Sequence, residues 1–253
     1  MRRRSGVWYN AAMLGVLLQN LTWIEAQDAF ERMNTILIPV GAACKEHGPH
    51  LPLNTDLLYA EYLARRVAEA CRVIVAPTVS YGHYPAFAEY PGSASLRAET
   101  FRDVMVDICR SFAGQGIRRF FVLNTGISTL PPLADARRIL AAEKIRMAYT
   151  DLHQLSTAAR AQVEQQPRGT HADEIETSNM LYIAPEVVNL SKARPELAPD
   201  SPGGLTRTAG GSGVYSPTGS WGDPTLATAE KGRIVTEAIV AGVLEQLRSE
   251  FGA

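Results

Sequence analysis

The segment KEHGPHLPLNTD, from Lys45 to Asp56, gathers side chains that bind metal ions and move protons. It contains Glu46, His47 and His50, although the whole chain has only five histidines. Imidazole and carboxylate groups together suit zinc, manganese or iron. The prolines and the glycine exclude a regular helix or strand and favour a stiff loop. The segment therefore predicts a divalent-metal site, while a helix cap by Asp56 and a loop hydrogen bond from His50 are the structural alternatives.

A second cluster of the same chemistry lies in GTHADEIETSNML, residues 169–181. His171 precedes Asp173, Glu174 and Glu176 at the start of a predicted helix. Acidic residues are also common in a first helical turn because the helix macrodipole favours them there. Two histidine–carboxylate clusters in a chain with few histidines nevertheless favour a shared site.

Several further residues are candidates for substrate binding, and each has a structural alternative. Lys45 beside the first cluster either binds an anionic substrate and replaces a lost charge, or points to solvent as most lysines do; solvent is the favoured alternative. Other candidates follow strands or lie in irregular loops: His50, His83, Asn124 and Trp221. Aromatic residues of loops 81–90 and 195–224 either line a pocket or pack at a subunit contact: Tyr84, Phe87, Tyr215 and Trp221. His153 is expected to be structural.

The elements that must position these residues follow an alternating pattern. Apolar, β-branched or aromatic runs predict buried strands at 35–42, 72–82, 118–126 and 145–151. Helical periodicity lies mainly between them, at 56–70, 100–114, 132–143 and 226–251. Continuously apolar strands that alternate with helices are typical of a mostly parallel sheet covered on both faces. The sequence therefore predicts an α/β fold.

Both the first cluster and the candidates after later strands fall at one edge of this sheet. In open α/β sheets, ligands bind beyond the carboxyl ends of the strands, and the first cluster directly follows the first predicted strand. We expect a single domain over residues 1–253, with an N-terminal extension at 1–20 and a long irregular loop at 195–224. The extension carries an apolar helical face formed by Met13, Leu14, Leu17 and Leu18.

Composition excludes several classes of function. The net charge of −1 gives no field for nucleic acid, and no apolar run is long enough to span a membrane. Three cysteines without close spacing argue against a disulfide framework and fit a cytoplasmic location. No nucleophile elbow of the type G-x-S-x-G is present.

Four motifs in order resemble those of the creatininase (creatinine amidohydrolase) family. They are PVGAACKEHGPHLPLNTD, YPGSASL, THADEIETSNML and GDPTLATAEKG, and the similarity covers the chain from Leu21 to the C-terminal helix. The resemblance implies a three-layer α/β/α sandwich with a mostly parallel central sheet. It also implies a hydrolase of amide C–N bonds other than peptide bonds, in which a metal-activated water attacks the carbonyl. The implied cofactor is Zn or Mn, one or two ions per chain, and the implied assembly is a homo-oligomer, commonly a hexamer.

The resemblance also implies roles for individual residues. His47 falls on a metal-ligand position, Asp56 on a bridging aspartate, and His171 on a proton-transferring histidine. Glu176 matches the glutamate of H-A-x-x-x-E-T. Apart from the resemblance, Glu46 and Glu176 are further ligand candidates, and Glu174 is a candidate catalytic partner of His171. The sequence departs from the family pattern at two positions, and no acidic ligand follows the second of them. Lys45 stands where the family has the glutamate of E-Q-H, and Gly126 stands where it has a histidine ligand.

The expected function is a metal-dependent hydrolase of a small amide, cyclic or peptide-like. Two alternatives stay open because of the departures. One is a family member without metal that binds a ligand or serves in an assembly. The other is an enzyme without metal, in which His171 and Glu174 or Glu176 exchange protons.

Overall fold

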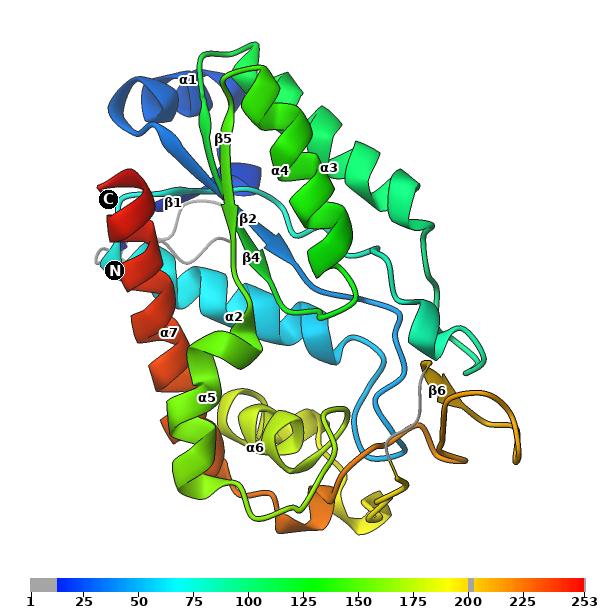
Figure 1. Cartoon of the computed structure of the whole chain (residues 1–253). Helices are drawn as coiled ribbons and strands as arrows, with labels where there is room; N and C mark the ends of the chain where they lie inside the picture. The colour runs from blue at the N-terminus through cyan, green and yellow to red at the C-terminus, as the bar shows by residue number, and fades with distance from the viewer. Residues whose placement is uncertain (1–12, 200–202, 253) are drawn as a thin grey trace.

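A sheet of five parallel strands forms the centre of the fold, which a computed structural model describes for residues 13–199 and 203–252 (Figure 1). The spatial order of the strands is β1-β3-β2-β4-β5. Their bounds are β1 Val16–Leu17, β2 Thr35–Val40, β3 Ile74–Val75, β4 Arg119–Asn124 and β5 Arg146–Tyr149. The longest pairing joins β2 to β4, in a register that runs from Thr35 opposite Arg119 to Val40 opposite Asn124.

Successive side chains of the central strands point to opposite faces of the sheet, which divides the core into two layers. Ile36 and Ile38 of β2 face one layer, whereas Leu37 faces the other. Neighbouring strand β4 repeats the pattern, with Phe120 in the first layer and Phe121 in the second. Every residue of β2 is buried, as expected for a strand covered on both faces.

Helices cover both faces of the sheet. The first layer holds α1 Trp23–Arg32, α3 Ala98–Ala113 and α4 Leu130–Ala142. The second holds α2 Thr55–Ala70, α5 Leu152–Val163, α6 Glu174–Ile183 and α7 Ala229–Phe251. Figure 1 shows α3 and α4 on one side of the strands and α2 and α7 on the other. The predicted three-layer α/β/α fold is confirmed.

Short elements complete the chain. The 3-10 helices are Leu18–Asn20, Pro85–Phe87, Pro185–Val187, Leu190–Lys192 and Pro224–Leu226. Within the predicted irregular loop, β6 Leu205–Thr206 pairs in parallel with β7 Val214–Tyr215. Among the described residues, no helix combines the length and the apolar character needed to cross a membrane.

The four predicted helices are present with ends displaced by a few residues, and so are the strands predicted at 35–42, 118–126 and 145–151. Of the strand predicted at 72–82, only Ile74–Val75 is a strand. The helical face expected from Met13 to Leu18 is wrong, because Val16 and Leu17 form an edge strand that pairs with β3. Helices α1 and α5 were not predicted. Residues 1–12 of the predicted extension lie outside the described residues.

Candidate metal centre

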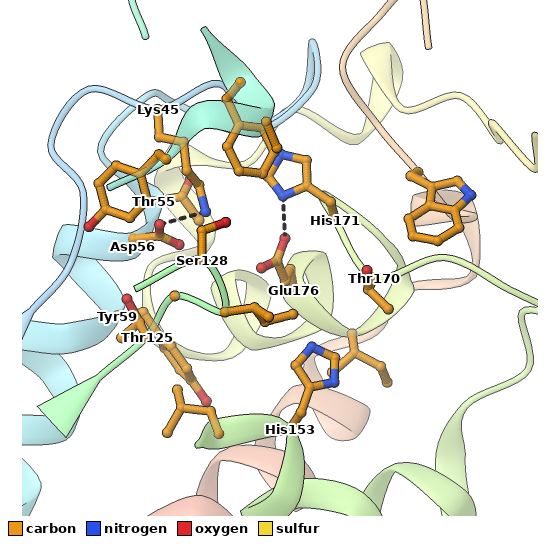
Figure 2. A pocket seen from close by; sticks show the side chains of 18 of the residues that line it. Lys45, Thr55, Asp56, Tyr59, Thr125, Ser128, His153, Thr170, His171 and Glu176 are labelled. Atoms are coloured by element: carbon orange, nitrogen blue, oxygen red, sulfur yellow. Dashed lines mark ion pairs between the residues drawn. The ribbon is translucent and has the colours of Figure 1, made fainter. Parts of the chain in front are cut away.

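A cavity of about 310 Å³ opens at the carboxyl edge of the sheet, near the lower limit for small-molecule sites. Loops after β2 and β4 contribute to its wall, as do the first turns of α2, α5 and α6. Figure 2 shows Lys45, Asp56, His171 and Glu176 around one part of this cavity. Apolar side chains complete much of the wall, among them Phe87, Ile127, Leu152, Ile175, Met180 and Ile239.

His47, His171 and Glu176 bring metal-ligating atoms together. One ligand atom from each lies within 4.8 Å of the other two, and they form the only such group among residues 13–199 and 203–252. The two imidazole rings lie against each other, with centroids 4.9 Å apart. Two imidazoles and one carboxylate form a donor set that suits zinc or manganese.

His47 presents one nitrogen to this centre because a carbonyl fixes the other. Its Nδ1 lies 2.9 Å from the carbonyl oxygen of Lys45, which only accepts, so Nδ1 carries a proton. In the neutral ring, Nε2 is then an acceptor, and it faces the Asp56 Oδ1 acceptor at 3.0 Å. Two acceptors so close require a shared cation or a second proton. The geometry therefore fits a divalent ion.

Glu46 fixes His171 in a similar way. Nε2 of His171 lies 2.7 Å from Glu46 Oε1, an acceptor, so Nε2 donates and Nδ1 faces Glu176 Oε2 at 3.5 Å. Burial alone would lower the pKa of this imidazolium, but the carboxylates of Glu46 and Glu176 together raise it. Glu46, predicted as a ligand, lies outside the three-residue donor group and orients His171 instead.

The carboxylate of Glu46 is itself held by backbone. Its Oε2 accepts a hydrogen bond of 2.8 Å from the Gly48 amide. Gly219, at a φ of +92°, passes so close to this carboxylate that any side chain at position 219 would collide with it. The glycine at position 219 therefore allows the 195–224 loop to pass close to the Glu46 carboxylate.

Lys45 and Asp56 form a buried ion pair at the cavity wall. Nζ lies 2.7 Å from Oδ2, and each side chain is only 6% exposed, so the expectation that Lys45 points to solvent is wrong. Burial opposes the charge of Lys45, but Asp56 and Glu176 raise its pKa. Burial likewise opposes the charge of Asp56, but Lys45 and His47 hold its pKa well below the ordinary range.

The first turn of α6 positions Glu176. Asp173 is the N-cap, and its Oδ1 accepts from the amides of Ile175 at 2.9 Å and Glu176 at 2.8 Å. Ala172, at a φ of +46°, adopts the left-handed conformation that is uncommon for residues other than glycine. This turn directs the Ala172 amide at Glu176 Oε2, 2.6 Å away. These hydrogen bonds therefore fix the position of Glu176 relative to His171 and to the Asp173 cap.

Six predicted site residues do not line the cavity, and two of them, Glu46 and His47, are described above. His50 Nε2 lies 2.8 Å from Thr177 Oγ1, and His83 Nδ1 lies 2.9 Å from the Leu96 carbonyl. Asn124 donates to the Gly126 carbonyl at 2.7 Å. Glu174 is fully buried and forms an ion pair with Lys231, so its contacts hold α6 to α7. Predicted Trp221 does line the cavity, and its indole donates to the Ala198 carbonyl.

His153 and Arg160 line the cavity but were not predicted for the site. Arg160 Nη1 lies 3.5 Å from His153 Nδ1. Burial, reinforced by the Arg160 charge, lowers the pKa of His153. The signal that could have identified His153 is its place directly after β5, at the same edge of the sheet as the two clusters. Of the aromatic residues that were expected either to line a pocket or to pack at a subunit contact, Tyr84 and Phe87 line the cavity and Tyr215 does not.

Comparison with known proteins shows the family and the fold. The family model for creatinine amidohydrolase matches residues 19–247. A mycofactocin precursor peptide peptidase of Mycobacterium ulcerans is 34% identical over 222 residues, which are 81% of each chain. A 3-dehydro-scyllo-inosose hydrolase of Thermotoga maritima is 29% identical over 251 residues, 89% of this chain and 80% of the relative. A solved structure titled "Creatininase Mn" superposes with a TM-score of 0.81 at 25% identity, covering 94% of this chain and 100% of that one.

Proposed function

Because the chain belongs to the creatinine amidohydrolase family, we propose that it is a metal-dependent hydrolase of small amides. Water adds to the amide carbonyl and the C–N bond breaks, which yields a carboxylate and an amine. Cyclic amides and short peptide-like amides are the substrate class. The observation that carries the proposal is the donor group of His47, His171 and Glu176 beside the cavity.

These three side chains would hold one divalent ion, zinc or manganese. His47 would contribute Nε2 and His171 would contribute Nδ1, because the other nitrogen of each ring already donates to an oxygen. Glu176 would contribute a carboxylate oxygen. A bound ion supplies a Lewis acid that polarises a carbonyl and lowers the pKa of water.

The remaining groups orient the donors and shape the substrate site. The Lys45 carbonyl keeps the proton of His47 on Nδ1, and Glu46 keeps the proton of His171 on Nε2. Hydrogen-bond partners of this kind fix the ring orientation and tautomer of ligating histidines. This geometry favours a ligand role for His171 over the proton-transfer role that the resemblance implies. The apolar wall excludes water and accommodates the body of a small substrate.

One metal-free alternative has support from a specific contact. His171 Nδ1 and Glu176 Oε2 are 3.5 Å apart, and the raised pKa of His171 suits an acid–base pair with Glu176. Glu174 is a weaker partner for this chemistry because Lys231 already neutralises it. The other alternative is a family member that binds a ligand without turnover.

Metal content and turnover, measured on the same protein samples, test the proposal. We expect zinc or manganese in protein purified without chelator, and hydrolysis of members of a panel of cyclic amides and short peptide amides. His47→Asn and Glu176→Gln should lose both the ion and the turnover. His83→Asn is the matched control, since His83 lies outside both the donor group and the cavity lining.

Two results would contradict the proposal. Turnover by chelator-treated, metal-free protein would favour the His171–Glu176 acid–base pair. Tight binding of a panel compound that is recovered intact would favour a non-catalytic member.

We also propose that the chain forms a homo-oligomer, with a hexamer as the expectation from the family resemblance, and acts in the cytoplasm. Light scattering on the eluting protein checks the assembly, and a hexamer would have six times the mass of the chain, 27.5 kDa.

A further inference from the structure

The Asp56 carboxylate is already occupied by groups of this chain. Oδ2 lies 2.7 Å from Lys45 Nζ, and Oδ1 lies 3.0 Å from His47 Nε2. Among the described residues, Oδ2 has no other polar partner. A carboxylate that bridges two divalent ions through both oxygens uses one oxygen for each. With the Lys45 ammonium on Oδ2, only the oxygen beside His47 is available to an ion.

Aromatic rings enclose the ammonium of Lys45. Nζ lies 4.8 Å from the centroid of Phe87 and 5.7 Å from that of Tyr84, within the range of cation–π attraction. Gly126 makes room for this arrangement, because even a Cβ there would lie 3.3 Å from Tyr84 Cε1. A larger residue at position 126 would have to displace the Tyr84 ring. The surroundings of Asp56 Oδ2 therefore accommodate and stabilise an ammonium group.

The ammonium also has donors left for a ligand. An ammonium carries three N–H groups, and Asp56 is the only ion-pair partner of Lys45 among the described residues. The side chain lines the cavity together with Thr125 and Ser128 (Figure 2). A buried cation with unused donors requires an oxygen acceptor from whatever enters the cavity.

We propose that the Lys45 ammonium replaces a second divalent ion, so that the centre binds a single metal ion and Lys45 binds the carbonyl oxygen of the substrate. The inference deepens the proposed amide hydrolysis and its second part rests on it. Lys45 would stabilise the negative charge that develops on that oxygen as water adds to the carbonyl carbon. Substrates would be amides whose carbonyl oxygen reaches Nζ while the scissile carbon faces the ion.

Metal titration and kinetics of Lys45→Met test the inference. Methionine keeps an unbranched apolar side chain but removes the charge. Manganese per chain is counted by elemental analysis after saturation, and its Kd is measured by calorimetry. The matched control is Lys231→Met, which removes a lysine from another buried ion pair, away from the cavity lining.

We expect one manganese ion per chain in the wild-type protein. In Lys45→Met the manganese Kd should fall about tenfold, because a neighbouring positive charge is lost and Asp56 is released. The kcat of the metal-loaded variant should fall about a hundredfold, with KM much less affected, because an oxyanion partner is lost. Tighter metal binding with slower turnover is a combination that a purely structural lysine would not produce. Lys231→Met should keep the manganese Kd and the kcat of the wild-type protein.

The outcomes separate this inference from the proposed function. Two ions per wild-type chain would overturn it while leaving metal-dependent hydrolysis intact, and this count needs no variant to fold. No ion in the wild type would contradict the proposed function. An ion gained by Lys45→Met would still support the inference that the Lys45 ammonium occupies the place of an ion. An unchanged Kd and kcat in Lys45→Met would overturn both parts of the inference.

Discussion

At the scale of single residues, each imidazole of the metal centre has one nitrogen committed to an oxygen acceptor. His47 Nδ1 donates to a backbone carbonyl, and His171 Nε2 donates to Glu46. A histidine whose proton is held in this way presents its lone pair in one direction only. The chemistry of the site therefore depends as much on Glu46 and the Lys45 carbonyl as on the ligands themselves.

His50 gives a prediction about acid stability. Burial lowers its pKa from 6.5 to about 4 in the folded protein, and the nearby His47 adds to the effect. Because the unfolded chain binds this proton more tightly, folding stability is lost as the pH falls from about 6.5 to about 4. The loss attributable to His50 should reach roughly 3 kcal/mol at the acidic end.

Urea denaturation at a series of pH values checks this prediction with His50→Gln. The variant should lose less free energy of unfolding than the wild type between pH 6.5 and pH 4, while the two slopes agree above pH 7.5. Identical slopes in the acidic range would show that His50 titrates normally in the folded protein.

Residue type and spacing indicated part of the candidate site. Two histidine–carboxylate clusters in a chain with few histidines indicated His47, His171 and Glu176, which the fold brings into one candidate donor group, although His171 was predicted to transfer protons. The burial of Lys45 could not be predicted, because it depends on rings that approach from the loop after β3. The orienting role of Glu46 could not be predicted either, since it requires a long-range contact with His171.

At the scale of elements, the N-cap of α6 links the fold to the metal centre. Asp173 caps α6, and the first turn of this helix carries Glu176. His171 lies two residues before Asp173. Asp173→Ala should lower the free energy of unfolding by about 1–2 kcal/mol because two amides lose their acceptor. The same variant should bind manganese more weakly, since the turn that holds Glu176 frays.

Asp173→Asn is the matched control, because an asparagine oxygen can still accept from the Ile175 and Glu176 amides. Chemical denaturation and manganese calorimetry compare the three proteins. Equal manganese affinity in Asp173→Ala and the wild type would mean that the cap stabilises the helix without positioning its ligand.

Sequence patterns at this scale identify long elements better than short ones. Central strands β2 and β4 and helices α2 and α3 have enough apolar residues for their periodicity to be clear. Strand β1 has only two residues, and it is a strand because its backbone pairs with β3. No local pattern distinguishes such a segment from a short apolar helix.

At the scale of the whole molecule, the sheet separates the layer of α6, which carries Glu176 of the candidate donor group, from the opposite layer of the core. Met105 of α3 is fully buried in that opposite layer. Met105→Ala should therefore lower the free energy of unfolding by about 2–5 kcal/mol and leave manganese binding by the folded protein unchanged. Manganese at a hundred times its Kd should add about 2.7 kcal/mol to both wild type and variant.

Denaturation with and without manganese measures both quantities. A manganese affinity that falls together with stability in Met105→Ala would mean that packing on the far side of the sheet sets the ligand geometry.

The ion pair of Lys45 and Asp56 also bears on how the protein depends on its environment. A cation that is part of the polypeptide cannot be removed by a chelator, diluted away, or exchanged for a competing metal. This part of the site's charge balance is therefore supplied when the chain is synthesised and does not vary with the metal content of the cell. With the proposed single-ion site, scarcity of metal would empty only the position beside His47, His171 and Glu176.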